Sequence, residues 1–128
     1  MASYWFGHVH LVSHDPLKTA QFYEEMFNAK RVSVRELSRG GINVELDLNG
    51  SRVLVMNPSG GSALGSAEAG HGLGHFGIRT DDLETAVADL KAKGVKFKEE
   101  MRVASSGAKV SFLWAPENVL IELLERGS

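Results

Sequence analysis

Cysteine is absent from the 128 residues of this chain, which excludes disulfide bonds, thiolate metal sites, iron–sulfur clusters and a cysteine nucleophile. The chain also has no large excess of one charge, because it contains 14 basic and 16 acidic residues and its net charge is -2. Such a balance offers no broad electrostatic surface to nucleic acid or an anionic membrane. No apolar run approaches the roughly 20 residues of a membrane-spanning helix, and no signal segment opens the sequence. We therefore expect a cytoplasmic protein that binds neither nucleic acid nor membrane.

The composition is that of an ordinary globular domain, with 43% hydrophobic and 23% charged residues. On folding, a chain of this length buries roughly two-thirds of the surface that its unfolded form exposes, so it needs no disulfide bond or structural metal to be stable. We expect one domain spanning residues 1–128.

An internal repeat organises the chain. The segment Gly7–Val12 resembles Gly74–Arg79, and Leu17–Ala20 resembles Leu83–Ala86. Each half therefore begins with a short strand, a turn that contains an aspartate, and a helix whose apolar residues recur at three- and four-residue steps. Alternating strands follow each helix, and Asn49-Gly50 is typical of a tight hairpin.

The repeat predicts two βαβββ modules in an α+β fold. Module 1 covers about residues 4–58, a Gly/Ser-rich connector covers 59–72, and module 2 covers about 73–126. Strands are expected at 8–12, 32–37, 42–48, 53–56, 74–79, 95–97, 109–114 and 119–124. Each helix must cover one sheet face, which leaves the other face open to a cleft or to a partner chain.

The open face should carry the polar residues of the strands, because side chains alternate across a strand. His8 and His10 share one face, opposite Val9 and Leu11. In the second half His75 and Arg79 share the equivalent face, and Glu122 lies within the apolar run Val119–Leu124. A carboxylate there is costly to bury unless a charge, a metal or a hydrogen bond compensates it.

A structural explanation exists for each of these residues: hydrogen-bonded strand histidines, an ion-paired Arg79, and a Glu122 at the frayed end of the chain. The row Asn43, Glu45 and Asp47 equally suits a solvated sheet face. What favours function is that His8 and His75 occupy the same repeat position. Two imidazoles and one carboxylate suit a divalent first-row metal that keeps positions open for substrate or water.

These motifs resemble the vicinal oxygen chelate superfamily, which includes glyoxalase I, methylmalonyl-CoA epimerase, extradiol dioxygenases, and fosfomycin- and bleomycin-resistance proteins. The resemblance covers nearly the whole chain. The motifs that carry it are Gly7-His8 to Asp15, Phe22-Tyr23, Gly72 to Asp82, Leu90 to Val95, and Pro116 to Leu123. It implies two modules that form a curved mixed sheet around a cleft, a homodimer, a small-molecule substrate and one divalent ion per site (Zn, Ni, Co, Mn or Fe).

By position, the resemblance assigns the metal ligands to His8, His75 and Glu122. The fourth ligand of glyoxalases and epimerases, a Glu or Gln, is replaced by Leu54. Glu45 resembles the catalytic carboxylate of the epimerase and His10 is a candidate acid–base group. Arg79 is a candidate for binding a substrate carboxylate. We expect metal-assisted proton transfer of the glyoxalase or epimerase type on a small carbonyl or thioester substrate.

Two alternatives stay open. An iron-dependent extradiol dioxygenase also uses two histidines and one carboxylate, although Phe112 stands where its catalytic tyrosine is expected. A non-catalytic binding protein of the bleomycin-resistance kind would use Trp5, Phe112 and Trp114 to stack on a ligand. The missing ligand at Leu54 favours a metal-free site of this last kind.

Overall fold

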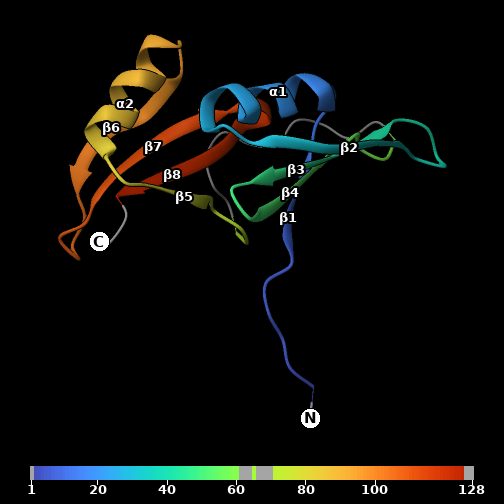
Figure 1. Ribbon diagram of the computed structural model, residues 1–128, viewed down its shortest axis with the longest axis horizontal. Coiled ribbons are helices and arrows are strands. Elements are labelled where there is room, and N and C mark those ends of the chain that lie inside the picture. The colour runs from blue at the N-terminus through green and yellow to red at the C-terminus, as the bar shows by residue number, and fades with distance from the viewer. Residues whose placement is uncertain (1, 61–64, 66–70, 126–128) are drawn as a thin grey trace. The chain divides into compact units, whose positions relative to one another are not determined.

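The computed structural model describes residues 2–60, 65 and 71–125 of the chain. The chain divides into two compact units, Met1–Ala63 and Leu64–Ser128, and each contains one βαβββ series (Figure 1). Much of the expected connector, residues 61–64 and 66–70, lies outside the described residues. That the two modules make one domain stays a prediction.

The helices and strands follow the order that the repeat predicts. The first unit contains β1 (His8–Val12), α1 (Pro16–Phe27), β2 (Lys30–Glu36), β3 (Ile42–Leu48) and β4 (Ser51–Met56). The second contains β5 (Phe76–Thr80), α2 (Leu83–Ala92), β6 (Lys96–Val103), β7 (Lys109–Ala115) and β8 (Val119–Glu125), with a short 3-10 turn, Pro116–Asn118, between the last two strands.

Each unit has its own four-stranded mixed sheet. The strand order is β1-β4-β3-β2 in the first unit and β5-β8-β7-β6 in the second. The first strand pairs in parallel with the last, and the other neighbours are antiparallel. The predicted α+β class and the βαβββ modules are confirmed.

Both helices begin at an aspartate cap in the same repeat position. The side chain of Asp15 accepts a hydrogen bond from the backbone N–H of Lys18 at 3.2 Å, and that of Asp82 accepts one from Thr85 at 3.1 Å. A cap of this kind satisfies a backbone donor that the first helical turn leaves unpaired. The turns with Asp15 and Asp82 therefore set where each helix starts against its sheet.

The core of each unit lies between its helix and one sheet face. In the first unit α1 packs on β2, β3 and β4, and in the second α2 packs on β6, β7 and β8 (Figure 1). Leu46 of β3 and Leu113 of β7 occupy equivalent positions of the repeat, and both are fully buried. The opposite sheet face carries the polar side chains of the strands.

Most strands lie within two residues of their predicted bounds, but one is much longer than predicted. The sequence predicts a strand at 95–97, but β6 extends from Lys96 to Val103. Among the described strands it pairs only with β7, and its register shifts between Phe97 and Glu99 and again between Glu99 and Arg102. Each bulge breaks the alternation of side chains, and an exposed edge strand has no apolar face to reveal it. The pattern therefore underestimates its length.

No helix among the described residues is long and apolar enough to cross a membrane. The segment before β1 extends away from the first sheet (Figure 1), and its residues Tyr4, Trp5 and Phe6 are all more than 80% exposed. Trp5, predicted to stack on a ligand, lies in this segment.

We predict that Leu46→Ala and Leu113→Ala each lower the free energy of unfolding by about 2–5 kcal/mol, because both remove a fully buried side chain and leave a cavity. Urea unfolding followed by circular dichroism measures the change. The matched control is Val103→Ala, on the edge strand β6, where the side chain is 66% exposed and the expected change is about 0.5 kcal/mol or less. Equal losses in all three variants would contradict the assignment of the core.

Candidate functional site

An imidazole and a carboxylate meet on the open face of the second sheet. The Nε2 atom of His75, one residue before β5, lies 3.2 Å from Oε1 of Glu122 in the middle of β8. Both side chains are partly exposed, at 38% and 21%. Glu122 therefore has the hydrogen-bonding partner that a carboxylate in an apolar strand requires, and it is not at a frayed end.

The aromatic ring of Phe112 in β7 packs beside this pair. It lies directly across from Glu122 in the sheet, and its ring meets the His75 ring edge-on with the centroids 5.3 Å apart. The guanidinium of Arg102 lies over the Phe112 ring, 5.8 Å from its centre, and also pairs with Glu99. Phe112 is thus held by an imidazole and a cation.

A cavity of about 260 Å³ opens at this place. It is lined by His75, Lys98, Glu99, Arg102, Phe112 and Leu120. Apolar and charged side chains together are typical of a small-molecule site, and the second unit alone supplies this cavity, with His75 but not Glu122 in its lining.

Two other residues predicted to bind substrate also lie on this sheet. Arg79 is exposed on β5 beside Leu124 of β8, and it makes no hydrogen bond or ion pair with any residue that the structure describes. Trp114 of β7 is half-buried next to Leu120, and Lys98 Nζ lies 6.0 Å from its ring centre. Among the described residues Arg79 therefore has no partner for its guanidinium, while the Trp114 ring has a lysine ammonium beside it.

The first sheet carries the other two predicted histidines on its open face. In β1 the side chains of His8 and His10 are exposed and Leu11 is buried, as alternation predicts. Partial burial lowers the pKa of His10, and the nearby charges of His8 and Arg39 lower it further. His10 is therefore an uncharged imidazole at neutral pH.

Glu45 forms an ion pair with an arginine that was not among the residues predicted for the site. Arg52 of β4 donates from Nε to Oε2 of Glu45 at 3.0 Å and from Nη2 to Oε1 at 3.1 Å. This two-point hydrogen bond is the main cause that lowers the pKa of Glu45, and the charges of Arg52 and Arg35 lower it further. Arg52 is therefore the residue that sets the protonation of Glu45.

The strand registers show which positions of the two sheets are equivalent. Leu54 pairs with His10 and Glu45 in the first sheet, where the second sheet pairs Glu122 with Gly77 and Phe112. Leu54 thus occupies the position in the first sheet that Glu122 occupies in the second. The first sheet accordingly has an apolar side chain between an imidazole and a carboxylate.

The predicted site residues therefore fall into two groups. The structure brings His75, Glu122 and Phe112 together in the second unit, and it places His8, His10 and Glu45 on one sheet face of the first. Within residues 2–60, 65 and 71–125, no cluster of three or more His, Asp or Glu side chains forms a ready-made metal site.

Alternation could have revealed one of the missed residues. Val53 and Val55 are buried, so Arg52, Leu54 and Met56 must share the open face with Glu45. No comparable signal marks Arg102, because the bulges of β6 hide which way its side chain points.

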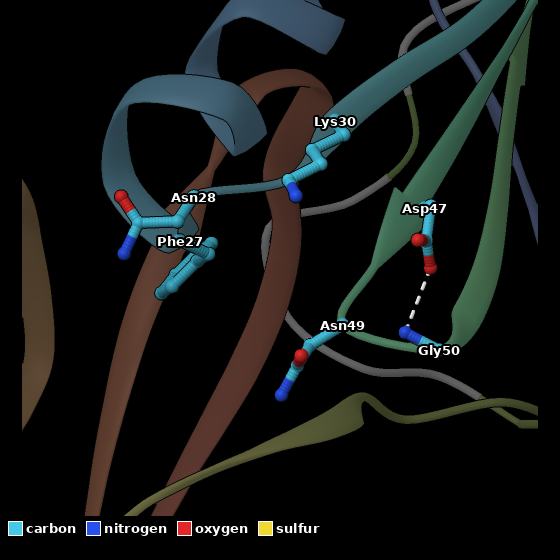
Figure 2. A pocket seen from close by; sticks show the side chains of 6 residues that line it. All are labelled: Phe27, Asn28, Lys30, Asp47, Asn49 and Gly50. Carbon is cyan, nitrogen blue, oxygen red and sulfur yellow. Dashed lines mark hydrogen bonds between the residues drawn. The ribbon is translucent and has the colours of Figure 1, made fainter.

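A second cavity, of about 410 Å³, lies in the first unit between the end of α1 and the β3–β4 hairpin (Figure 2). Its lining residues are Phe27, Asn28, Lys30, Asp47, Asn49 and Gly50. Asp47 accepts a hydrogen bond from the Gly50 backbone N–H at 2.7 Å (Figure 2), which stabilises the hairpin turn. None of the predicted site residues lines this cavity.

Comparison with known proteins relates the chain to enzymes. It is 30% identical over 126 residues to human mitochondrial methylmalonyl-CoA epimerase, a match that covers 91% of this chain and 71% of the epimerase. It is 28% identical over 113 residues to a lactoylglutathione lyase of Arabidopsis thaliana. That match covers 86% of this chain but only 40% of the lyase, so the chain spans less than half of that relative.

Solved structures show the same fold. A glyoxalase family protein from Enterococcus faecalis superposes with a TM-score of 0.81 at 22% identity, over 94% of this chain and 97% of that one. The fosfomycin resistance protein FosX from Listeria monocytogenes superposes with a TM-score of 0.75 at 21% identity, over 98% and 94%.

A family model described as the Glyoxalase/Bleomycin resistance protein/Dioxygenase superfamily matches residues 5–123. This match spans almost the whole chain, both sheets included, and it confirms the resemblance predicted from the motifs. The chain belongs to the Glyoxalase/Bleomycin resistance protein/Dioxygenase superfamily.

Proposed function

We propose that the chain is a divalent-metal-dependent lyase or isomerase of the glyoxalase/epimerase type. Its substrate is a small carbonyl compound or thioester, and the reaction moves a proton at the carbon next to the carbonyl group. The observation that carries the proposal is the contact between His75 and Glu122 beside a cavity. The names of the relatives, an epimerase of a CoA thioester and a lyase of a glutathione thioester, support the same substrate class.

The residues present suit a metal ion. An imidazole nitrogen and a carboxylate oxygen, both partly exposed and 3.2 Å apart, are donors that Zn, Ni, Co, Mn and Fe accept. His8, in the other unit, is the third ligand on the resemblance alone, and Leu54 supplies no fourth. When bound, a divalent ion stabilises negative charge on a carbonyl oxygen.

Glu45 is the proposed general base. Its carboxylate takes the proton from the carbon next to the carbonyl, and the protonated acid returns it to the same or the neighbouring carbon. Arg52 holds both carboxylate oxygens, which fixes the orientation of Glu45 and keeps it ionised. A base with a lowered pKa is weak, so the reaction depends on a substrate whose C–H acidity is already raised.

The other predicted residues complete the proposal. His10, uncharged at neutral pH, is available to relay a proton. Arg79, whose guanidinium has no partner within the described part of the chain, is available for a substrate carboxylate, and Phe112 and Trp114 offer apolar surface. That the protein is a cytoplasmic homodimer stays a prediction from the sequence.

A non-catalytic binding protein is the second candidate, and Leu54 is the observation that favours it. This side chain occupies the position that in the second sheet belongs to Glu122, so the first sheet lacks an oxygen donor there. Such a protein would bind its ligand without tightly held metal. The dioxygenase alternative has no comparable support, and oxygen uptake with a catechol and ferrous iron tests it.

We predict that protein purified without chelators contains about one divalent ion per site, and that His75→Ala and Glu122→Ala lose it, because each removes one of two adjacent donors. Elemental analysis by mass spectrometry measures the content. His71→Ala, a histidine change outside the predicted site, is the control and should retain the metal. A metal-free parent protein would favour the binding protein, and retention by both site variants would refute the ligand assignment.

We predict that Glu45→Gln lowers the turnover of proton exchange by about 10²–10⁴-fold, the usual contribution of a positioned general base, while the metal content is unchanged. Deuterium incorporation from heavy water into methylmalonyl-CoA and S-lactoylglutathione, followed by mass spectrometry, measures the rate. Glu24→Gln is the control, since Glu24 forms the same kind of ion pair with Arg31 on α1 and β2. Full activity of Glu45→Gln would show that another group is the base.

Arg52→Gln should shift the acid limb of the pH–rate profile to higher pH. Arg52 lowers the pKa of Glu45, and Glu45 acts as a base only when ionised. The wild type therefore keeps its activity at a pH below the ordinary pKa range of carboxyl groups. The variant instead loses its activity as the pH falls through that pKa range. The dependence of kcat/KM on pH measures the shift, with Arg31→Gln as control. An unmoved limb would mean that Glu45 is not the titrating base.

A further inference from the structure

A buried amide in the first sheet lacks a hydrogen-bond partner. Asn43 of β3 is only 9% exposed, and its Oδ1 atom accepts no hydrogen bond from any residue within the described part of the chain. An unsatisfied buried acceptor of this kind destabilises the folded state, because the group loses its hydrogen bonds to water and gains none in return. Native proteins rarely keep one without a reason.

Asn43 lies on the same open face as the proposed base. It directly precedes Val44, which is fully buried, and it stands two residues before Glu45, so both point away from the helix. Two residues along a strand span about 6.8 Å. Across the sheet Asn43 is flanked by Met56 and Arg35.

The fold itself does not require an amide at this position. In the second sheet the equivalent residue is Val110, which pairs with Leu124 as Asn43 pairs with Met56. Val110 is 1% exposed, so the same place in the same architecture is filled by an apolar side chain. The polar group in the first sheet therefore needs an explanation outside packing.

We propose that the Asn43 amide recognises the substrate by accepting a hydrogen bond from an N–H group that lies a fixed distance from the reacting carbon. This inference rests on the proposed function. The terminal torsion of asparagine is broad, so the amide can turn to meet a donor.

The spacing between Asn43 and Glu45 matches the dimensions of one class of thioester substrate. In a thioester of a 2-amidoethyl thiol, –S–C–C–NH–CO–, the amide N–H lies five covalent bonds from the carbon next to the thioester carbonyl. When extended, that separation is comparable to the roughly 6.8 Å between the two side-chain positions. Thioesters of CoA and of glutathione both contain this unit. A substrate of this class would place its acidic carbon at Glu45 and its N–H at Asn43.

The first experiment asks whether the amide serves the fold. We expect Asn43→Val, and Asn43→Leu as a second variant of similar outline, to be at least as stable as the wild type in urea, because each removes an unsatisfied acceptor. The reverse change, Val110→Asn, should lower the unfolding midpoint by burying an unpaired amide. A clear loss of stability in both Asn43 variants would overturn the inference, since the amide would then be structural.

The second experiment compares two probes, the methylmalonyl thioesters of N-acetylcysteamine and of butanethiol, which differ in the N–H group. Calorimetric affinity and the KM for deuterium exchange are measured for wild type and Asn43→Val. We expect the wild type to favour the N–H probe by roughly three- to tenfold, the contribution of one hydrogen bond. The variant should lose this preference while kcat stays nearly unchanged.

The outcomes separate the two proposals. If the wild type exchanges the proton but the variant keeps the probe preference, the inference about Asn43 fails and the reaction stands. If the wild type binds with the preference but exchanges no proton, the proposed reaction fails and the role of Asn43 in recognition stands. A wild type that binds neither thioester overturns the inference about Asn43 and restricts the proposed function to small carbonyl compounds.

Discussion

The parallel pairing of the first and last strands of each repeat is the constraint on which the candidate site depends. His8 and His75 are the histidines at the same position of the two repeats. The parallel pairing determines which residue of the last strand lies next to the residue two positions after each of them. In the second sheet that neighbour of Gly77 is Glu122, and in the first sheet the neighbour of His10 is Leu54. One register therefore decides where an oxygen donor is present and where it is absent.

The two repeats have kept the same framework and changed the chemistry of its open face. The second sheet combines the imidazole of His75 with Glu122 above an aromatic floor. The first has an arginine-bound carboxylate, Glu45, and a buried amide, Asn43, at places where the second has Phe112 and Val110. Because apolar side chains fill these places in one repeat, the fold tolerates either kind, and the polar ones are free to serve binding or catalysis.

Electrostatics on the first sheet sets the protonation of its polar groups in opposite ways. Arg52 keeps Glu45 ionised, whereas burial and neighbouring positive charge keep His10 uncharged. Near neutral pH the face thus offers one carboxylate that accepts a proton and one imidazole that carries no charge.

The sequence by itself determined the βαβββ repeat, the helix caps at Asp15 and Asp82, and which side chains share the open face, because caps and strand alternation are local properties. It also selected His75 and Glu122, whose contact the structure contains. The pairing of Glu45 with Arg52, the contact of Arg102 with the Phe112 ring, and the length of β6 were decided only by the tertiary structure. Each of these depends on how strands align across the sheet and where bulges shift that alignment, which the periodicity of a single strand does not encode.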